Sequence, residues 1–157
     1  MENQTKQDLK CGVDYVGVNC TFWCHDGKGR VLMHKRSNKC RDEQGRWDCG
    51  AGAMEFGETF EDAVRREVQE EYGVASLAVE YVATRNVLRE HNGRKTHWVK
   101  NLHLVLVDPS KVKNMEPEKI DEIGWFTLDK LPEPLHSQVT SEVEMIRDFL
   151  SKTQKRL

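Results

Sequence analysis

The sequence lacks the features that mark membrane, secreted and nucleic-acid-binding proteins. No window of its 157 residues approaches the roughly 18 consecutive apolar residues of a membrane-spanning helix. The N-terminal segment, MENQTKQDLK, contains no apolar core of a secretory signal. The formal net charge is −2, whereas general nucleic-acid binding needs a basic surface. We therefore expect a cytoplasmic protein that binds neither membranes nor nucleic acids.

Close cysteine pairs, repeats and linkers are absent as well. The five cysteines are odd in number and do not show the paired spacing of zinc sites. Cys20 and Cys24 would face one side of a strand, which indicates two buried thiols, and reduced cysteines fit a cytosolic protein. The length suits one domain, which we place at residues 13–157 behind a polar tail at residues 1–12.

A carboxylate-rich helix is predicted over residues 60–72. Thr59 is suited to the N-cap with Asp62 as its capping-box partner, and Gly73 is suited to a left-handed C-cap. At about 100° per residue, Glu67, Glu70 and Glu71 share one arc of the helix. That arc overlaps the edge of the apolar stripe, which consists of Phe60, Val64, Val68 and Tyr72. A merely solvated acidic face would lie opposite this stripe.

The position of these acids favours a metal site. Neighbouring carboxylates beside a core repel one another unless a cation compensates them. Magnesium prefers carboxylate and carbonyl oxygens. Glu55 and Glu58 lie just before the helix in a loop with Gly50, Gly52 and Gly57, which permit backbone shapes that other residues resist. Such a loop can direct carbonyls to a metal and amides to a phosphate.

The rest of the chain predicts an α/β fold. Strands are expected over residues 13–24, 31–33, 77–88, 96–107 and 123–128, with hairpin turns at 25–30 and 91–94 and polar loops at 37–45 and 108–122. Ser137 is expected to cap a final helix that buries Val139, Val143, Ile146 and Leu150. Strands around one central helix, followed by a second helix, indicate a mixed sheet between helices.

The segment from Gly52 to Val74 resembles the signature of one enzyme family. Its fixed positions fill the pattern G-x5-E-x7-R-E-U-x-E-E-x-G-U, in which U is aliphatic. The chain thus resembles the Nudix (MutT-like) hydrolases, and the resemblance is sharpest over residues 31–74. It implies the Nudix α/β/α sandwich and hydrolysis of a diphosphate linkage in a nucleotide, with Mg²⁺ or alternatively Mn²⁺ as cofactor.

The resemblance also implies roles for individual residues. The expected metal ligands are the carboxylates of Glu67, Glu70 and Glu71, assisted by Glu58 and by the main-chain carbonyl of Ala51. A metal-bound water attacks phosphorus, with Glu67 as the first candidate for its base and Glu70 as the second. Arg66 is expected to hold a catalytic glutamate by a charge-assisted hydrogen bond. The chain departs from the family where Gly50-Ala51-Gly52 replaces the usual Pro-Gly-Gly.

Weaker similarities concern the substrate. Residues 56–59 and 116–119, ahead of Trp125-Phe126, resemble nucleotide-sanitising members that hydrolyse nucleoside triphosphates, including oxidised ones, to monophosphate and pyrophosphate. In that group an acidic residue of the loop at residues 108–122, called the late loop below, contacts the base or the metal. The candidates here are Glu116, Glu118, Asp121 and Glu122, although each of them also suits a surface loop. Arg36 is a candidate phosphate contact, and with Lys35 it equally suits a solvated basic pair.

Other activities stay open at this point. The absence of proline between Val74 and Pro109 counts against ADP-ribose hydrolases. Arg36-Ser37, Arg41 and Gly45 match the spacing of coenzyme A hydrolases, but Cys49-Gly50-Ala51 breaks their Phe-Pro-Gly ending. Nucleotide-sugar hydrolysis and a nucleotide-sensing module without catalysis are further alternatives. A homodimer could bury the strand at 123–126 and the C-terminal helix.

Overall fold

Strand β1, Gly17–His25, lies in the middle of the sheet and buries side chains on both of its faces. The computed structural model describes residues 8–154, with side chains up to residue 152. Cys20, Phe22 and Cys24 point into one core cluster, and Trp23 points into the other. A strand that is covered on both faces reads as a nearly continuous apolar run, which explains the sequence of β1.

The sheet is mixed, as predicted. Its order is β3-β2-β1-β6-β5, while β4 pairs with β1 and β7 pairs with β2. The strands other than β1 are β2 Arg30–Arg36, β3 Trp47–Asp48, β4 Gly50–Ala53, β5 Ser76–His91, β6 Arg94–Val107 and β7 Ile120–Thr127. β1 and β6 are parallel, and the remaining pairs are antiparallel. β1 pairs with β4 over residues 19–22 and with β2 only at His25, so the sheet splits beside β1.

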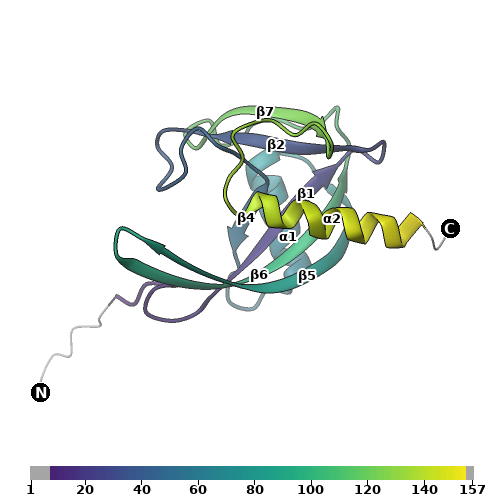
Figure 1. Ribbon diagram of the computed structural model, residues 1–157. Coiled ribbons are helices and arrows are strands. Elements are labelled where there is room, and N and C mark those ends of the chain that lie inside the picture. The colour runs from purple at the N-terminus through teal and green to yellow at the C-terminus, as the bar shows by residue number, and fades with distance from the viewer. Residues whose placement is uncertain (1–7, 155–157) are drawn as a thin grey trace, which may run out of the picture.

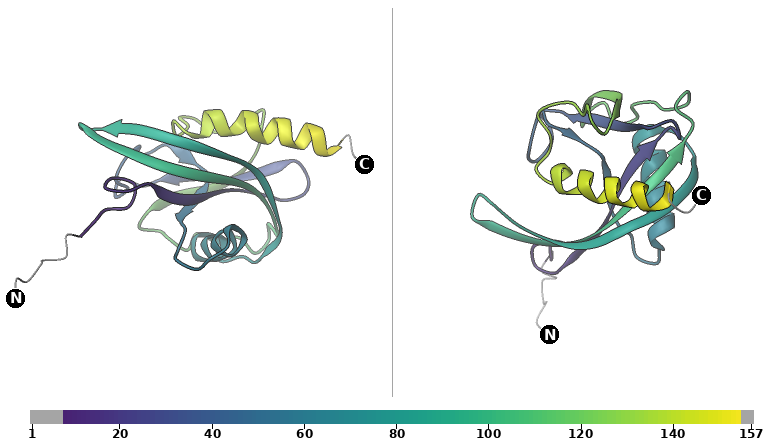
Figure 2. Two further views of the ribbon diagram at one scale, coloured as in Figure 1. Left: turned by 90° about the horizontal axis from the view of Figure 1, so that it is seen from below. Right: turned by 45° about the vertical axis from the view of Figure 1, so that its right-hand side comes forward.

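Two helices cover opposite faces of this sheet, which confirms the α/β/α sandwich (Figure 1; Figure 2, left). Helix α1, Phe60–Tyr72, packs Val64, Val68 and Tyr72 into the cluster that contains Phe22. Helix α2, Val139–Gln154, packs its predicted stripe into the cluster of Trp23, Leu102 and Leu104. No described helix has the length and apolar character needed to span a membrane.

The predicted ends of α1 are confirmed. The Thr59 side chain accepts a hydrogen bond from the Asp62 amide, and the Asp62 carboxylate accepts one from the Thr59 amide. Gly73 has φ +61° and ends the helix. This double capping fixes where the acidic helix begins and which way it faces.

The hairpin of β5 and β6 extends beyond the body of the molecule (Figure 1). Asn92 and Gly93 form its turn with φ values of 50° and 73°, as the Asn-Gly sequence predicts. The five cysteines are free thiols, and Cys20 and Cys24 are buried on one side of β1 as expected.

Some boundaries differ from the predictions. β1 begins at Gly17 and not at Val13, because residues 10–15 form a turn whose Gly12 carbonyl accepts a hydrogen bond from the His97 amide. β7 begins at Ile120, so the preceding loop is shorter than predicted. Residues 1–7 of the predicted tail lie outside the described residues.

The prediction that Ser137 caps α2 is wrong. The helix begins at Val139, and the Gln138 carbonyl accepts the hydrogen bond from the Glu142 amide. The Ser137 hydroxyl and amide both donate to the Glu43 carboxylate instead. A carboxylate of a distant loop therefore binds the serine that the local sequence predicts as the helix cap.

Candidate active site

Arg66 connects the glycine-containing loop to helix α1. Its guanidinium donates to Glu58 Oε1 at 2.6 Å and Oε2 at 3.0 Å, to Glu67 Oε1 at 2.6 Å and to Glu70 Oε2 at 3.4 Å. It also donates to the Ala53 carbonyl at 3.1 Å. The Arg66 hydrogen bond holds the pKa of Glu58 down at about 2. Three of the predicted metal ligands thus meet at one arginine.

Strand β4 approaches α1 so closely that a side chain at position 52 would collide with the Glu67 carboxylate. A Cβ atom on Gly52 would lie 1.8 Å from Cδ of Glu67, and one on Gly50 would lie 1.9 Å from the Phe22 ring. The prediction that Gly50 and Gly52 provide unusual backbone shapes is therefore wrong, since neither has a positive φ and both provide space. Gly57, with φ +90°, does fulfil that prediction.

Glu71 is a buried carboxylate with an unsatisfied oxygen. The residue is 7% exposed, and its Oε2 atom has no hydrogen-bond partner. Burial raises the pKa of Glu71 well above its ordinary value, and the charges of Glu116 and Glu67 add to this effect. A buried, unpartnered carboxylate oxygen is costly, and a bound cation would remove that cost.

The donors present suit a hard divalent cation. They are carboxylates and main-chain carbonyls, the ligands that Mg²⁺ prefers. Burial raises the pKa of Glu67 in spite of Arg66, which also indicates a group that needs a positive partner. Among the described residues, no group of three or more His, Cys, Asp and Glu side chains is arranged so that it could hold a metal ion. The Arg66 guanidinium instead contacts Glu58, Glu67 and Glu70.

A cleft of about 260 Å³ opens where the sheet splits. Its lining residues are His34, Arg36, Lys39, Cys40, Arg41, Asp48, Cys49, Ala51, Glu71, Glu116, Lys119 and Ile120. It therefore brings together four predicted site residues, which are Ala51, Glu71, Arg36 and Glu116. Glu58, Glu67 and Glu70 do not line it and lie beside it at the Arg66 network. Four cations and several carboxylates in one cleft suit an anionic ligand bound together with a metal.

Arg36 lies in the cleft wall and is held there by two aspartates. It donates to Asp42 Oδ1 at 2.9 Å and to Asp48 Oδ2 at 3.3 Å. Its side chain is 19% exposed, so the solvated basic pair does not describe it. Lys35, in contrast, does not line the cleft.

The candidate acids of the late loop divide into two groups. Glu116 reaches the cleft and accepts a hydrogen bond from Lys119 at 3.0 Å. Glu118 pairs with Lys39 at the surface, and Asp121 and Glu122 are exposed on β7. Glu116 is thus the member of this set that the structure places at the site.

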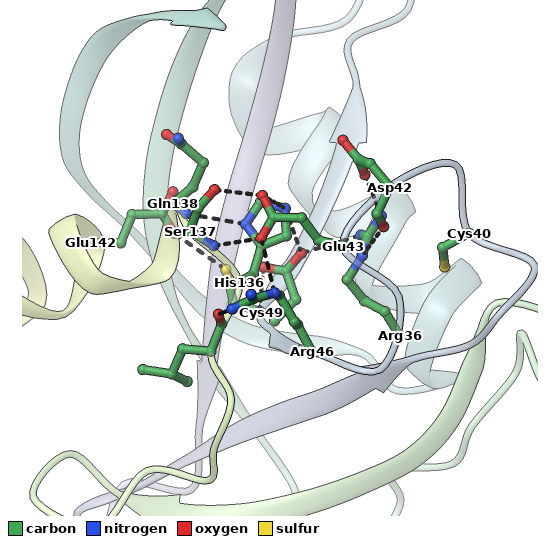
Figure 3. Close-up of polar contacts among 12 residues, drawn as sticks. Arg36, Cys40, Asp42, Glu43, Arg46, Cys49, His136, Ser137, Gln138 and Glu142 are labelled. Carbon is green, nitrogen blue, oxygen red and sulfur yellow. Dashed lines mark hydrogen bonds and ion pairs between the residues drawn. The ribbon is translucent and has the colours of Figure 1, made fainter. Parts of the chain in front are cut away.

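The loop at residues 37–46 forms another wall and is anchored to the start of α2 (Figure 3). Glu43 has φ 46° and accepts the hydrogen bonds from Ser137. Arg36 donates to the Asp42 carbonyl at 3.0 Å. Arg46 donates to the Leu135 carbonyl at 3.0 Å. These contacts hold Arg41, which lines the cleft, on a tethered loop.

A second hollow of about 180 Å³ adjoins the cleft on the α2 side of the sheet. It shares Arg36, Arg41, Asp48 and Ala51 with the cleft. Asn19 and Thr21 also line it, and the Oδ1 and Oγ1 atoms of these two residues are buried without hydrogen-bond partners. The two hollows together suit a ligand with an anionic part and a neutral, hydrogen-bonding part.

Sequence reasoning missed several residues of the cleft. His34 stands two residues before Arg36 on β2, so strand periodicity places both side chains on one face and could have found it. Asp48 and Lys119 gave no comparable signal, because their position depends on how β3 and the late loop pack.

Comparisons with known proteins agree with this architecture. A family model described as NUDIX domain matches residues 16–149. The MutT NUDIX hydrolase from Burkholderia pseudomallei is 30% identical, with a TM-score of 0.74 over 84% of this chain and 98% of that one. The NUDIX domain of Shewanella oneidensis NrtR, solved with ADP ribose, is 21% identical with a TM-score of 0.68, which shows the shared fold.

Curated relatives match by sequence. The NAD-capped RNA hydrolase NudC of Pseudomonas aeruginosa is 32% identical over 102 residues, covering 65% of this chain and 34% of that protein. The human NAD-capped RNA hydrolase NUDT12 is 48% identical over 58 residues, covering 33% of this chain. The match spans only 13% of NUDT12. The chain belongs to the Nudix family, and it matches only about a third or less of the length of these two curated relatives.

Proposed function

We propose that this protein is a magnesium-dependent hydrolase that cleaves a nucleoside triphosphate, including oxidised forms, to a monophosphate and pyrophosphate. The observation that carries the proposal is the cleft that combines the buried, unpartnered Glu71 carboxylate with Arg36, Lys39, Arg41 and Lys119. A cation would stabilise the charged form of this carboxylate, and the four basic residues attract a polyanion.

The metal would be held by Glu67, Glu70, Glu71 and the Ala51 carbonyl, with Glu58 assisting. When bound, Mg²⁺ would polarise the phosphate and lower the pKa of a coordinated water, and Mn²⁺ could replace it. Glu67 is the first candidate for the base, since it is a partly buried carboxylate whose pKa is raised by burial, and Glu70 is the second. Arg66 positions these glutamates through its hydrogen bonds.

The shape of the site supports a nucleotide. The phosphates would occupy the basic cleft, and the nucleoside would occupy the adjoining hollow. Asn19 and Thr21 contribute polar side chains to the lining of that hollow. Ala51 lies between the two parts and lines both of them.

The test is hydrolysis of a substrate panel with MgCl₂, with identification of the products. The panel contains nucleoside triphosphates with their 8-oxo forms, ADP-ribose, nucleotide sugars, coenzyme A and NAD. Glu70→Gln should lower turnover by about 100-fold if Glu70 binds metal or water. Glu61→Gln is the matched control, because Glu61 is exposed on the same helix and, among the described residues, forms an ion pair with Arg65 alone. Release of monophosphate without pyrophosphate would refute the triphosphate proposal.

Nucleotides joined to a second group through a diphosphate, such as NAD, ADP-ribose, nucleotide sugars and coenzyme A, form the second candidate class. The relatives NudC and NUDT12 are named as NAD-capped RNA hydrolases, so NAD tests whether this chain shares that chemistry. Mononucleotide products from NAD, ADP-ribose or coenzyme A would assign the enzyme to this class. Saturable binding without turnover of any panel member would instead indicate a nucleotide sensor.

A homodimer through β7 and α2 is also proposed as the assembly. β7 pairs with β2 along one edge, and no described strand pairs with its other edge. Sedimentation velocity at micromolar concentration tests this, and a single species of monomer mass would contradict it.

A further inference from the structure

His34 enters the cleft from β2 and contacts the last residue of α1. His34 is 6% exposed and lines the cleft, whereas Tyr72 is 1% exposed and belongs to the core. His34 Nδ1 and the Tyr72 hydroxyl lie 2.7 Å apart, the distance of a good hydrogen bond. The contact therefore joins the helix that carries the acidic residues to the basic wall of the cleft.

The direction of this hydrogen bond follows from what surrounds Tyr72. Among residues 8–154, the Tyr72 hydroxyl has no other hydrogen-bond partner. If Nδ1 carried the proton and donated it, the phenol hydrogen would be buried without an acceptor, which is costly. If the phenol donates to Nδ1, both groups are satisfied.

A neutral imidazole that accepts at Nδ1 carries its hydrogen on Nε2. No described group bonds to His34 Nε2, and this atom is not among the buried polar atoms that are sealed from solvent. The N–H group is thus open to the cleft.

We propose that Tyr72 fixes the tautomer of His34 so that His34 Nε2–H donates a hydrogen bond to a phosphate oxygen of the bound diphosphate. His34 is then a substrate-binding residue, and Tyr72 is a positioning residue that acts through it. The choice of a diphosphate as the ligand rests on the function proposed above. A neutral donor contacts the phosphate without placing another positive charge beside the metal ligands.

The first test reads the tautomer directly in the free protein, without any activity. Nitrogen-15 NMR of histidine-labelled protein at pH 7.5 should show His34 with a protonated Nε2 and an acceptor-type Nδ1. His34→Gln assigns the signal. Tyr72→Phe should convert it toward a mixture of tautomers, because the donor to Nδ1 is gone. A protonated Nδ1 in the wild type would overturn the proposal.

The second test measures binding of methylenediphosphonate, which cannot be hydrolysed, by calorimetry with MgCl₂ present. His34→Leu should weaken binding by about 10- to 100-fold, the range for losing a hydrogen bond to a charged group. His34→Gln should retain most of the affinity, because its amide can reach the Nε2 position. Equal affinity of wild type and His34→Leu would overturn the proposal.

The two proposals can fail separately. If no panel nucleotide is hydrolysed but diphosphonate binding depends on His34, the proposed function fails and the His34 assignment stands. If nucleotides are hydrolysed and the affinity for diphosphonate is the same without His34, the assignment fails and the enzyme stands. Since the NMR measurement uses the wild-type protein, a destabilised variant does not prevent the test.

Discussion

Arg66 donates two hydrogen bonds to the Glu58 carboxylate, from Nε to Oε1 at 2.6 Å and from Nη2 to Oε2 at 3.0 Å. The two residues come from different elements, since Glu58 ends the loop and Arg66 lies in the second turn of α1. Paired hydrogen bonds of this kind fix orientation as well as distance. The loop and the helix are therefore locked in one relative position.

The Arg66–Glu58 contact leads to a prediction for Arg66→Lys. Lysine keeps the charge but cannot form the paired contact, so we expect turnover to fall by about 10- to 100-fold. Arg65→Lys is the matched control, because Arg65 lies on the exposed face of α1 and also pairs with a glutamate, although its Nε and Nη2 both donate to one oxygen, Oε1 of Glu61. Steady-state kinetics of both variants would check this. Equal losses would show that the effect comes from the helix and not from the site.

Gly52→Ala should reduce activity more than stability. The new methyl group would lie 1.8 Å from Glu67 Cδ and must displace that carboxylate. We expect at least about a 10-fold loss of turnover, since small displacements of catalytic groups are costly. Ala53→Ser, at an exposed position of the same strand, serves as the control. Wild-type activity in Gly52→Ala would show that Glu67 need not lie where it does.

Glu71→Gln should change stability in opposite directions with and without metal. Without metal, removal of the buried charge should stabilise the protein by about 1 kcal/mol. With Mg²⁺ at about 100 times its dissociation constant, the wild type should gain about 2.7 kcal/mol, and the variant should gain much less. Thermal unfolding with EDTA and with MgCl₂ measures both effects. An unchanged response of the variant to Mg²⁺ would remove Glu71 from the metal site.

Glu142→Ala should destabilise the fold by about 3 kcal/mol. The buried Glu142 carboxylate accepts from Arg85 at 2.9 Å and from Trp23 Nε1 at 3.2 Å, and Lys100 lies 3.6 Å away. Its removal leaves two half-buried cations without their anion. Urea unfolding measures the effect. Glu144→Ala, at an exposed position of α2, should stay within about 0.5 kcal/mol of the wild type.

His136 should make stability depend on pH. Burial lowers the pKa of His136, although the carboxylates of Asp48 and Glu43 oppose this. In the unfolded chain the histidine pKa is about 6.5, so below that pH the unfolded state binds the proton more readily. The contribution of His136 is therefore complete above pH 6.5 and is lost as the pH falls. Urea unfolding from pH 7.5 to 5.5 should show a steeper loss in wild type than in His136→Gln, and parallel curves would contradict this.

Sequence signals predict those parts of the fold that depend on interactions between neighbouring residues. The capping of α1 by Thr59 and Gly73 and the turn at Asn92-Gly93 depend on neighbouring residues, and these predictions are confirmed. Ser137 failed because a long-range partner, Glu43, competes for its hydroxyl. The backbone freedom predicted for Gly52 is not what the structure requires there. The position needs a residue without a side chain, because the Glu67 carboxylate lies against it in the folded structure.

The sequence predicts the candidate site only in part, again because local signals do not describe long-range packing. The motif spacing placed the acids of α1, and their meeting at Arg66 follows from one helix and its preceding loop. The cleft depends on how β2, β3 and the late loop come together, which no periodicity encodes. Lys119 and Asp48 therefore became visible only in the structure.

Neighbouring residues of strand β4 face different parts of the molecule. Gly52 faces the Glu67 carboxylate, while Ala51 pairs with Thr21 and lines the hollow on the α2 side. Ala51 also lines the cleft, whereas Asn19 and Thr21 line only the hollow. If the hollow binds the nucleoside as proposed, substitutions at Asn19 and Thr21 would change substrate preference without altering the residues of the cleft.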